Sequence, residues 1–574
     1  MGHPFLLGVL FALVFYAVSA TPSLLPRRWW WHGFVSGPLA ALGYAIGWGL
    51  TNALNWAREA WGITLTGPAP LMETLKWVGV AAVLAWVLWM SIRSYKESRR
   101  TAIQIGVKPV GLGEYLLALL ATAAMFAVTM LLIVLLTKLF GWTLNLLERW
   151  LPAPISWALA VLLAVVLAIL LLTRTAFRLV MAFFAKAARG INERSYSELS
   201  PPRVPERSGS PASAHPWESI GGQGRLFLGH GPDAQQIEAV TGRPAIQPVR
   251  VYVGLPDGDS DPQEIARQAV AELRRAGGLR RSVIVVNTAT GSGWVDEWLC
   301  QPVEYMTGGN CAIISMQYSY MFSAALFMSD METCAAAGAA LFEAVEAAVN
   351  ELPAEKRPAV IVAGESLGAA GSQAAFASLD DFIARADGAV WVGTPHTSPL
   401  VQELTRSRRK GSPEIAPVVD DGRHARFAPA PEQLRADLFG QELGPWEFPR
   451  AAFVQHASDP VARYSHDLWR REPDWLRERV GADVSPQMKH APLATHLQMI
   501  ADLPVAGLAP AGHGHTYHRE LMDAWIEVLG LSEPQALGPI PSGTWIDAQM
   551  KEQISQAIEE DLQRYHKGLG KPKD

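Results

Sequence analysis

Cysteine is scarce in this chain, whose 574 residues contain only Cys300, Cys311 and Cys334. Three cysteines at these spacings provide neither a disulfide framework nor the paired ligands of a zinc site. We therefore expect ordinary buried thiols. No metal and no cofactor is predicted for this protein.

Charge is also scarce, because charged residues make up 18% of the chain against about 25% in an average soluble protein. The formal net charge of −5 is spread out, and no basic stripe of the kind that binds nucleic acid is visible, so we expect no nucleic-acid partner. The apolar excess lies before Gly190, while the rest mixes charge, glycine and proline as a soluble domain does. Together with 21 tryptophans, this pattern indicates that residues 1–190 lie in a lipid bilayer.

Long apolar runs occur within residues 1–190. A helix needs about 20 mostly apolar residues to cross a bilayer. About five stretches meet that length, at residues 3–20, 33–54, 72–92, 113–139 and 155–182. The first has no Lys or Arg before its apolar core, which favours an uncleaved helix over a secretory signal.

Positive residues fall on alternate connections between these runs. Short cytoplasmic loops are rich in Lys and Arg, and such residues follow the first, third and fifth stretches: Arg27, Arg28, Arg93, Lys96, Arg99, Arg100, Lys108, Arg174, Arg178, Lys186, Arg189 and Arg194. This pattern predicts an inner (cytoplasmic) membrane protein whose C-terminal domain faces the cytoplasm. No ionisable cluster lies in the middle of a span, so the helices are expected to anchor the protein or to receive lipid rather than to transport.

Composition divides the remainder into three parts. Residues 191–221 are rich in Ser, Pro and charge, which predicts a flexible linker. Residues 222–530 are expected to form one folded domain, followed by a C-terminal extension at 531–574. In the folded domain, apolar runs alternate with helical stretches and mark strands at 249–253, 282–286, 311–315, 359–363, 388–392 and 452–455. Strands that are apolar on both faces predict a mostly parallel sheet covered by helices, an α/β fold.

The fourth run ends in Gly364-Glu-Ser-Leu-Gly368, and a helix of small residues follows at once. The pattern G-x-S-x-G is weak by itself in a chain of 49 glycines. A preceding strand and a following small-residue helix strengthen it, because a nucleophile elbow is a sharp strand-to-helix turn that exposes the serine hydroxyl. We therefore predict that Ser366 is a nucleophile.

A serine nucleophile needs a general base that is oriented by a carboxylate. Asp459 follows the strand 452–455 and is the predicted acid, although an aspartate before a proline also fits a helix N-cap. The predicted base is His515, with His513 in the same Gly-His-Gly-His sequence as the alternative. A tight turn or a metal site is another interpretation of this histidine pair.

An oxyanion site needs backbone N–H donors near the nucleophile. Leu367, which follows Ser366, is the first predicted donor. The glycine-containing loop 288–294 is expected to supply the second through Thr290 and Gly291. The alternative, a phosphate-binding loop, is not favoured because no G-x-x-x-x-G-K-[ST] sequence occurs.

Several segments together resemble a bacterial α/β-hydrolase family whose members carry a multi-helix membrane region before the hydrolase domain. They are Thr21-Pro-Ser-Leu-Leu-Pro-Arg27, Gly364–Gly368, Gln455-His-Ala-Ser-Asp-Pro460, Pro473-Asp-Trp475 and Pro510-Ala-Gly-His-Gly-His515. One departure is Ala462-Arg463-Tyr464, where further aromatic residues would be expected, and it bears on the shape of the acyl pocket.

This resemblance implies an esterase-like hydrolase with a Ser366, Asp459 and His515 triad. Some relatives are associated with hydrolysis of aminoacyl lipids, such as alanyl-phosphatidylglycerol or alanyl-diacylglycerol, so the expected partners are the bilayer and a membrane lipid substrate. A general lipid or acyl esterase is the alternative enzyme, and a non-catalytic membrane scaffold is an alternative of a different class. The oligomeric state is left open.

Overall fold

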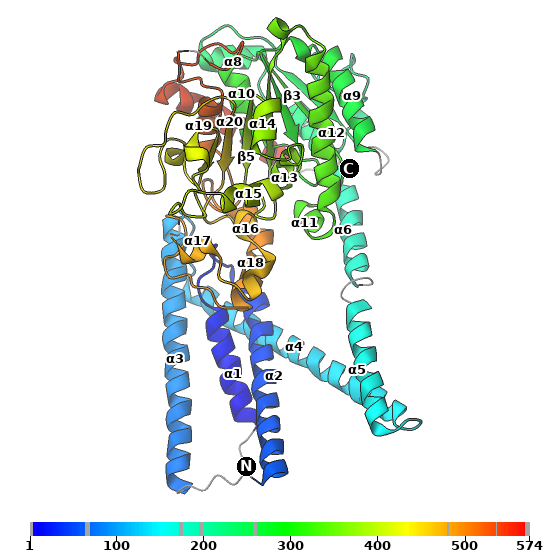
Figure 1. The fold of residues 1–574 in the computed structure, drawn as a ribbon, viewed down its shortest axis with the longest axis vertical. Helices are drawn as coiled ribbons and strands as arrows, with labels where there is room; N and C mark the ends of the chain where they lie inside the picture. Colours follow the sequence, from blue (N-terminus) through cyan, green and yellow to red (C-terminus); the bar gives the residue numbers. More distant parts are fainter. Residues whose placement is uncertain are drawn as a thin grey trace. The chain divides into compact units, whose positions relative to one another are not determined.

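The computed structural model describes residues 4–62, 69–170, 176–193, 199–255, 261–478, 481–534 and 536–568. They form two compact units (Figure 1). The helical unit comprises Met1–Leu179 and His466–Ala506, and the sheet unit comprises Val180–Ser465 and Gly507–Asp574. The division differs from the predicted boundaries, because a segment from within the predicted domain 222–530 folds with the N-terminal helices.

The helical unit contains seven named α-helices among its described residues: α1 (Pro4–Ser19), α2 (Trp29–Trp61), α3 (Ala69–Gln104), α4 (Leu112–Leu147), α5 (Ala153–Leu170), α17 (Asp474–Arg477) and α18 (Ala494–Asp502). By length and apolar composition, three segments are able to cross a membrane: Trp29–Trp61, Glu73–Gln104 and Leu112–Leu147. These helices indicate association with a membrane.

The prediction of about five spans is therefore corrected to three within the described part of the chain. The apolar helices Phe5–Ser19 and Ala153–Leu167 are shorter than the roughly 20 residues that a span needs. The fifth predicted stretch, 155–182, includes residues 171–175, which lie outside the described residues.

Helix α2 packs closely on both of its neighbours through glycines spaced four residues apart. Gly33 and Gly37 approach α4, so that a Cβ atom added to Gly33 would lie 2.6 Å from the Cβ atom of Ala121. Gly43 and Gly47 approach α1 in the same way. Small residues at this spacing let helix backbones meet in a bilayer, where packing rather than the hydrophobic effect drives helix association.

Helix α18 docks against the loop that joins α1 to α2. The Gln498 amide donates to the backbone oxygens of Ser19 and Thr21 at 2.9 and 3.1 Å. The buried Asp502 carboxylate lies 3.6 Å from Arg27 Nε. These contacts fold the segment 466–506 into the helical unit, and they involve the Thr21–Arg27 sequence singled out above.

The sheet unit contains the remaining elements. Its helices are α6 (Ala176–Asn192, which begins in the helical unit), α7 (Gly222–Gly229), α8 (Ala234–Thr241), α9 (Pro262–Arg275), α10 (Glu297–Met306), α11 (Ser323–Ser329), α12 (Met331–Asn350), α13 (Leu367–Gln373), α14 (Leu379–Arg385), α15 (Pro399–Arg406), α16 (Pro460–Arg463), α19 (Glu520–Val528) and α20 (Ala548–Gly568). Its strands are β1 (Val249–Val253), β2 (Val283–Thr288), β3 (Cys311–Met316), β4 (Ala359–Glu365), β5 (Gly388–Val392), β6 (Ala425–Ala428) and β7 (Arg450–Val454).

The seven strands form one sheet in the order β1-β3-β2-β4-β5-β7-β6, and every pair is parallel. The predicted α/β fold with a parallel sheet is confirmed. The sequence prediction missed β6, a four-residue edge strand with Arg426 at its centre, because its apolar run is too short to stand out.

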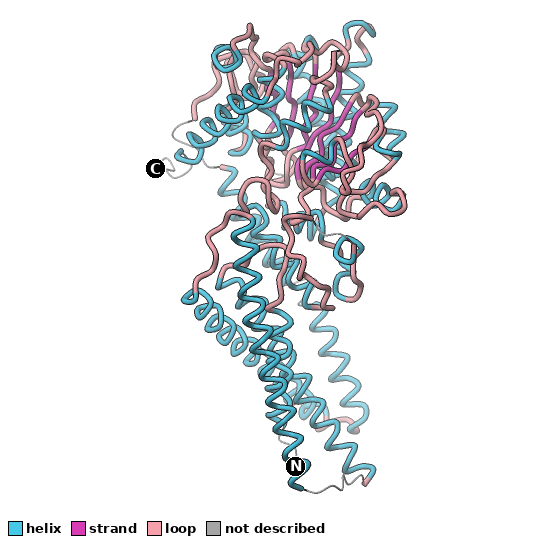
Figure 2. The backbone as a smooth tube through the Cα atoms, turned by 90° about the vertical axis from the view of Figure 1, so that its left-hand side faces the viewer, coloured by secondary structure: helices cyan, strands magenta, loops and turns pink. Residues whose placement is uncertain are grey.

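Helices cover both faces of this sheet, and Figure 2 shows its strands among them. Strand residues alternate between two apolar clusters, as Val251 and Tyr252 do in β1. Helices α9 and α12 pack in the first cluster, and α10, α19 and α20 pack in the second. Burial on both faces explains why the strands are apolar throughout.

The segment predicted as a flexible linker is partly packed against the sheet. Arg207 is buried, and its guanidinium donates to four backbone oxygens, those of Leu228, His230, Gly231 and Pro232. Ser208 N–H donates to the Arg250 oxygen of β1 at 3.1 Å. These bonds hold Arg207 and Ser208 against the sheet unit in spite of the disorder-prone composition around them. Residues 194–198 lie outside the described residues.

The predicted C-terminal extension contributes to the core of the sheet unit through α20. Ile554 and Ile558 are fully buried in the cluster formed with α10 and α19. The predicted domain end at residue 530 therefore divides one continuous core.

Replacing Ile558 with alanine is expected to destabilise the sheet unit by about 2–5 kcal/mol, because it removes buried methyl groups and leaves a cavity. Gln553→Ala on the exposed side of the same helix is the matched control. Urea denaturation of the full chain in detergent, followed by tryptophan fluorescence, measures both. Equal midpoints for the two variants would contradict the assignment of α20 to this core.

Candidate active site

Ser366 stands at a strained turn between β4 and α13. Its backbone angles are φ 57° and ψ −124°, a region that residues other than glycine rarely occupy. Ser366 N–H donates to the Val392 oxygen of the neighbouring strand β5 at 2.9 Å. The turn has the geometry of a nucleophile elbow, as the G-x-S-x-G pattern predicts.

Glycines on both sides of Ser366 allow the turn to pack tightly. A Cβ atom on Gly364 would lie 2.5 Å from the backbone of Gly368. The site of a Cβ atom on Gly368 is equally closed, by the backbone oxygen of Thr288 at the end of β2. Side chains at either position would push α13 away from the sheet, so the motif requires both glycines.

Asp459 lies just beyond β7, fully buried at the start of α16. Its Oδ1 accepts from Val461 N–H at 2.8 Å, as an N-cap does. Its Oδ2 accepts a second hydrogen bond from His515 Nδ1 at 2.7 Å. One oxygen of Asp459 therefore caps α16, and the other contacts His515.

The loops that carry Asp459 and His515 are joined by two further contacts. Gly514 N–H donates to Ser458 Oγ at 2.8 Å, and the Gly514 oxygen lies 3.0 Å from His456 Nδ1. The His456 Nε2 atom lies 2.9 Å from Glu520 Oε1 at the start of α19. These bonds fix the direction of the His515 ring.

Of the two candidate histidines, His515 is the one that lies against Asp459. His515 Nε2 has no hydrogen-bond partner among the described residues. His513 lies in the turn of the same segment, where it forms a backbone bridge with Thr516.

Tyr517 belongs to this site, and sequence reasoning missed it. Its hydroxyl donates to Asp459 Oδ2 at 2.7 Å, beside the bond from His515. Burial raises the pKa of Tyr517 above its usual value, so it remains a donor. Its place two residues after His515 was the available signal, but sequence spacing does not reveal which side chains share an acceptor.

The N–H groups of Thr290 and Gly291, predicted as oxyanion donors, already have hydrogen-bond acceptors in the protein. Thr290 N–H donates to the Trp294 oxygen at 2.9 Å, and Gly291 N–H donates to Ser323 Oγ at 3.2 Å. Thr290 bonds within its own loop, and Gly291 bonds to the first residue of α11. Both amides already have acceptors, so neither is an available donor in this structure. Leu367 is the first residue of α13, and the first N–H groups of a helix have no acceptor within the helix.

A cavity of about 530 Å³ opens beside His515. Its lining includes the carboxyl groups of Asp296 and Glu365 and the rings of Trp294 and Trp298. Burial raises the pKa of Asp296 to about 7, and burial with the nearby Asp296 and Asp459 carboxyls raises the pKa of Glu365 well above its usual value. The cavity is therefore lined by aromatic rings and by carboxyl groups that ionise less readily than usual.

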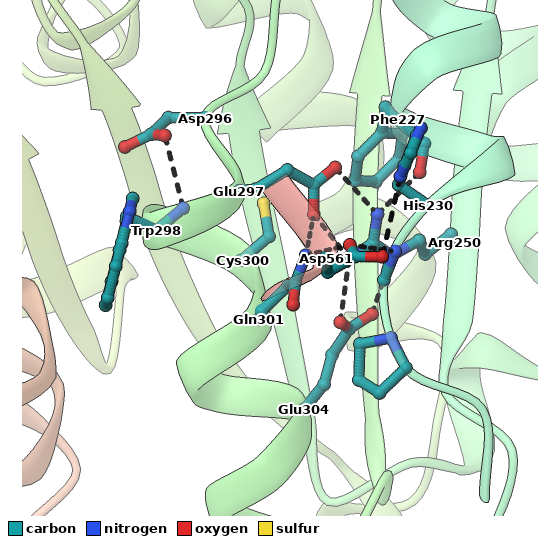
Figure 3. A network of polar contacts seen from close by, with 12 residues as sticks. Phe227, His230, Arg250, Asp296, Glu297, Trp298, Cys300, Gln301, Glu304 and Asp561 are labelled. Carbon is teal, nitrogen blue, oxygen red and sulfur yellow. Dashed lines mark hydrogen bonds and ion pairs between the residues drawn. The ribbon is translucent and has the colours of Figure 1, made fainter. Parts of the chain in front are cut away.

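Glu297, which lines this cavity, belongs to a buried ion-pair network (Figure 3). Arg250 is fully buried and binds two carboxylates, with its Nη2 2.9 Å from Glu297 Oε2 and its Nε 2.7 Å from Glu304 Oε1. Gln301 links Glu297 to Asp561 of α20. The network ties β1, α10 and α20 together, and removing one partner would leave a buried charge uncompensated.

The cysteines lie outside the polar site. All three are free thiols and buried, as expected. Cys334 packs under the elbow helix, with its Sγ 3.0 Å from the Leu367 oxygen. The described residues contain no group of three or more His, Cys, Asp and Glu side chains suited to a metal ion.

A parallel sheet covered on both faces, with a strained serine turn after its central strand, defines an α/β-hydrolase fold. The chain belongs to the alpha/beta-hydrolase family: residues 249–536 match that family, and residues 20–232 match the description "Alpha/beta-hydrolase family N-terminus". This membership supports hydrolase activity. No curated protein and no solved structure matches this chain.

Gly393 separates the elbow from the His515 ring. Its φ is +52°, and a Cβ atom there would lie 2.5 Å from His515 Cε1. Gly393→Ala is therefore expected to displace the imidazole and to slow the labelling of Ser366 by a fluorophosphonate about 10²-fold, the usual effect of a misplacement near 1 Å.

The control for Gly393→Ala is Gly440→Ala, which has a similarly positive φ of +82° but no atom within 4 Å of an added Cβ. It introduces backbone strain without the clash, so its labelling rate should stay close to that of the wild type. Equal labelling of both variants would show that Gly393 does not position His515.

Proposed function

We propose that this protein is a membrane-bound serine hydrolase that cleaves an ester bond of a membrane lipid, an aminoacyl-phosphatidylglycerol or aminoacyl-diacylglycerol. The observation that carries the proposal is the His515 to Asp459 hydrogen bond of 2.7 Å, at the strand ends that also carry Ser366. His515 Nε2 has no hydrogen-bond partner among the residues that the structure describes. The choice of substrate is motivated by the resemblance of several sequence segments to a hydrolase family, some of whose members are associated with hydrolysis of aminoacyl lipids.

In the proposed reaction, His515 Nε2 takes the proton of the Ser366 hydroxyl while the oxygen attacks the ester carbonyl. Asp459 holds the His515 Nδ1 proton, which keeps Nε2 as the basic nitrogen and stabilises the imidazolium that forms. Tyr517 donates to the same carboxylate oxygen and holds it in place. The imidazolium then protonates the departing alcohol, and water releases the acyl group by the same steps.

The negative charge on the carbonyl oxygen requires donors near Ser366. Leu367 N–H is the proposed donor, because it follows the nucleophile and begins a helix whose dipole favours negative charge at that end. The partnered amides of Thr290 and Gly291 leave the proposal with one donor from the predicted set.

Replacing Ser366 with alanine is expected to reduce hydrolysis of activated esters by about 10⁴-fold or more, because the oxygen that forms the acyl-enzyme is removed. Full-length protein in detergent micelles serves for a p-nitrophenyl ester assay and for fluorophosphonate labelling. Ser407→Ala, an exposed serine at the end of α15, is the matched control and should be labelled like the wild type.

Two results would decide against this function. Retention of a tenth of wild-type hydrolysis by folded Ser366→Ala would exclude Ser366 as the nucleophile. Absence of labelling and of hydrolysis in the wild type would favour the non-catalytic scaffold.

We place the sheet unit on the cytoplasmic side of an inner membrane, with the substrate taken from the inner leaflet. Because α4 begins on the side where α3 ends and leads away from it, this placement requires the predicted stretch 155–182 to cross the membrane back again after α4. The support is the distribution of positive residues around the apolar helices, since Arg27 and Arg28 follow α1 while Arg93, Lys96, Arg99 and Arg100 lie in the last turns of α3.

A protease-protection experiment tests this orientation. A C-terminal epitope tag should survive protease added to intact spheroplasts and be lost only after the membrane is opened. A tag inserted within residues 63–68, on the opposite connection, is the control and should be cleaved in intact spheroplasts. Cleavage of the C-terminal tag in intact spheroplasts would place the sheet unit outside and leave the serine chemistry unaffected.

A further inference from the structure

We propose that Glu365 and Asp296 form a cation-binding subsite beside His515, which accepts the α-ammonium group of an aminoacyl ester. This inference rests on the proposed serine hydrolysis and names the chemical feature of the acyl group that the site selects. It extends to any ester of an amino acid, whether the alcohol is a lipid or a small soluble molecule.

Both carboxyl groups are buried in the cavity wall and incompletely bonded. Asp296 and Glu365 are each 7% exposed. Asp296 Oδ1 accepts from Trp298 N–H at 3.1 Å as the N-cap of α10. Asp296 Oδ2 and Glu365 Oε2 have no N–H or hydroxyl donor among the described residues, and the two carboxyl groups interact with each other. Buried acceptors are rarely left unpaired, because their desolvation is not compensated.

The other carboxylates around the cavity already have donors. Glu297 is paired with Arg250, as Figure 3 shows, and Glu520 Oε1 lies 2.9 Å from His456 Nε2. The Asp459 oxygens accept from Val461, His515 and Tyr517. Within the described wall of this cavity, Glu365 and Asp296 are therefore the carboxyl groups without an Arg or Lys partner.

Charge favours a cationic ligand at this pair. Burial raises the pKa of both groups, so that at neutral pH the pair tends to hold fewer than two negative charges. A cation bound between the two carboxyl groups would lower both of their pKa values, so that both groups would be ionised at neutral pH. The rings of Trp294 and Trp298 line the same cavity, and aromatic faces also attract cations.

Distance selects an α-ammonium among possible cations. Glu365 Oε1 lies 3.9 Å from His515 Nε2, the atom that exchanges a proton with the reacting oxygens. A cationic group of the substrate that binds to Glu365 must therefore be only a few covalent bonds away from the ester carbonyl of the same substrate. An α-ammonium is two bonds from that carbon, whereas the cation of a choline headgroup is farther away. A bare metal ion needs more ligands than this pair offers.

The test compares two soluble esters that differ in one group. p-Nitrophenyl alaninate and p-nitrophenyl propionate share their acyl skeleton and leaving group, and only the first carries an α-ammonium. The assay uses the full chain in detergent at about pH 6, below the usual α-amino pKa of about 7.7. Rates are divided by the rates of uncatalysed hydrolysis, because the ammonium itself activates the ester.

Wild-type protein should prefer the alaninate in kcat/KM by about tenfold or more, the usual effect of a charged hydrogen bond. In Glu365→Gln and in Asp296→Asn this preference should fall by about tenfold, mainly through a higher KM for the alaninate. Glu365→Asp keeps the charge and should recover part of the preference. Thermal unfolding of each variant checks that the fold is retained.

The outcomes separate this inference from the proposed function. No preference in the wild type, or an equal loss on both esters in a folded Glu365→Gln variant, would overturn the subsite while Ser366-dependent hydrolysis remained. Loss of the Ser366 dependence would instead overturn the proposed function.

A second arm distinguishes the source of the aminoacyl group. Vesicles that contain alanyl-phosphatidylglycerol replace the soluble ester, and release of alanine is measured for the wild type and for Glu365→Gln. A matching loss supports a lipid substrate for the subsite. Cleavage of the soluble alaninate alone would keep the subsite and assign it to soluble aminoacyl esters.

Discussion

The register of three neighbouring strands is the constraint on which the candidate active site depends. Glu365 of β4 is paired with Val392 of β5, and Val392 is paired with Val454 of β7. Because all three strands are parallel, their carboxyl ends meet at one edge, and the chain leaves each strand next to the others. Ser366 begins there, Gly393 fills the middle position, and Asp459 follows a short loop. A shift of one residue in either pairing would turn alternate side chains to the opposite face and separate these groups.

The buried carboxyl groups near this edge are of two kinds, those that are compensated by bonded partners and those that are not. Glu297 and Glu304 are neutralised by Arg250, and that pairing holds β1 against α10. Asp459 is held by donors on its own loop and on the His515 loop. Asp296 has one such donor, the Trp298 N–H, and neither Asp296 nor Glu365 is paired with an Arg or Lys among the described residues, although burial makes an uncompensated carboxyl group costly. Such uncompensated groups gather at functional sites more than elsewhere, which connects the electrostatics of the cavity to the choice of substrate.

The sequence identified those parts of the site that depend on local chemistry. The G-x-S-x-G pattern located Ser366 because a strand-to-helix turn with such close packing tolerates only glycine at Gly364 and Gly368. Apolar runs located six of the seven strands, since strands buried on both faces leave a continuous signal. The missed strand β6 has Arg426 at its centre, and the predicted linker contains Arg207, whose four backbone acceptors lie more than 20 residues away. Composition indicates only how well a segment is solvated on average. A few long-range hydrogen bonds are enough to fix a polar segment in the fold.

The sequence by itself determined the α/β class, the sharp turn at Ser366, the apolar character of the N-terminal region and the order of Ser366, Asp459 and His515 along the chain. Only the tertiary structure decided that His515 rather than His513 lies against Asp459, and that Tyr517 shares its acceptor. It also decided that the amides of Thr290 and Gly291 already have acceptors, Trp294 and Ser323. Residues 466–506 fold with the apolar N-terminal helices through Gln498 and Asp502. These outcomes depend on directions and distances between segments that are far apart in the chain. Residue type and sequence spacing do not specify which donor lies within hydrogen-bond distance of a given acceptor.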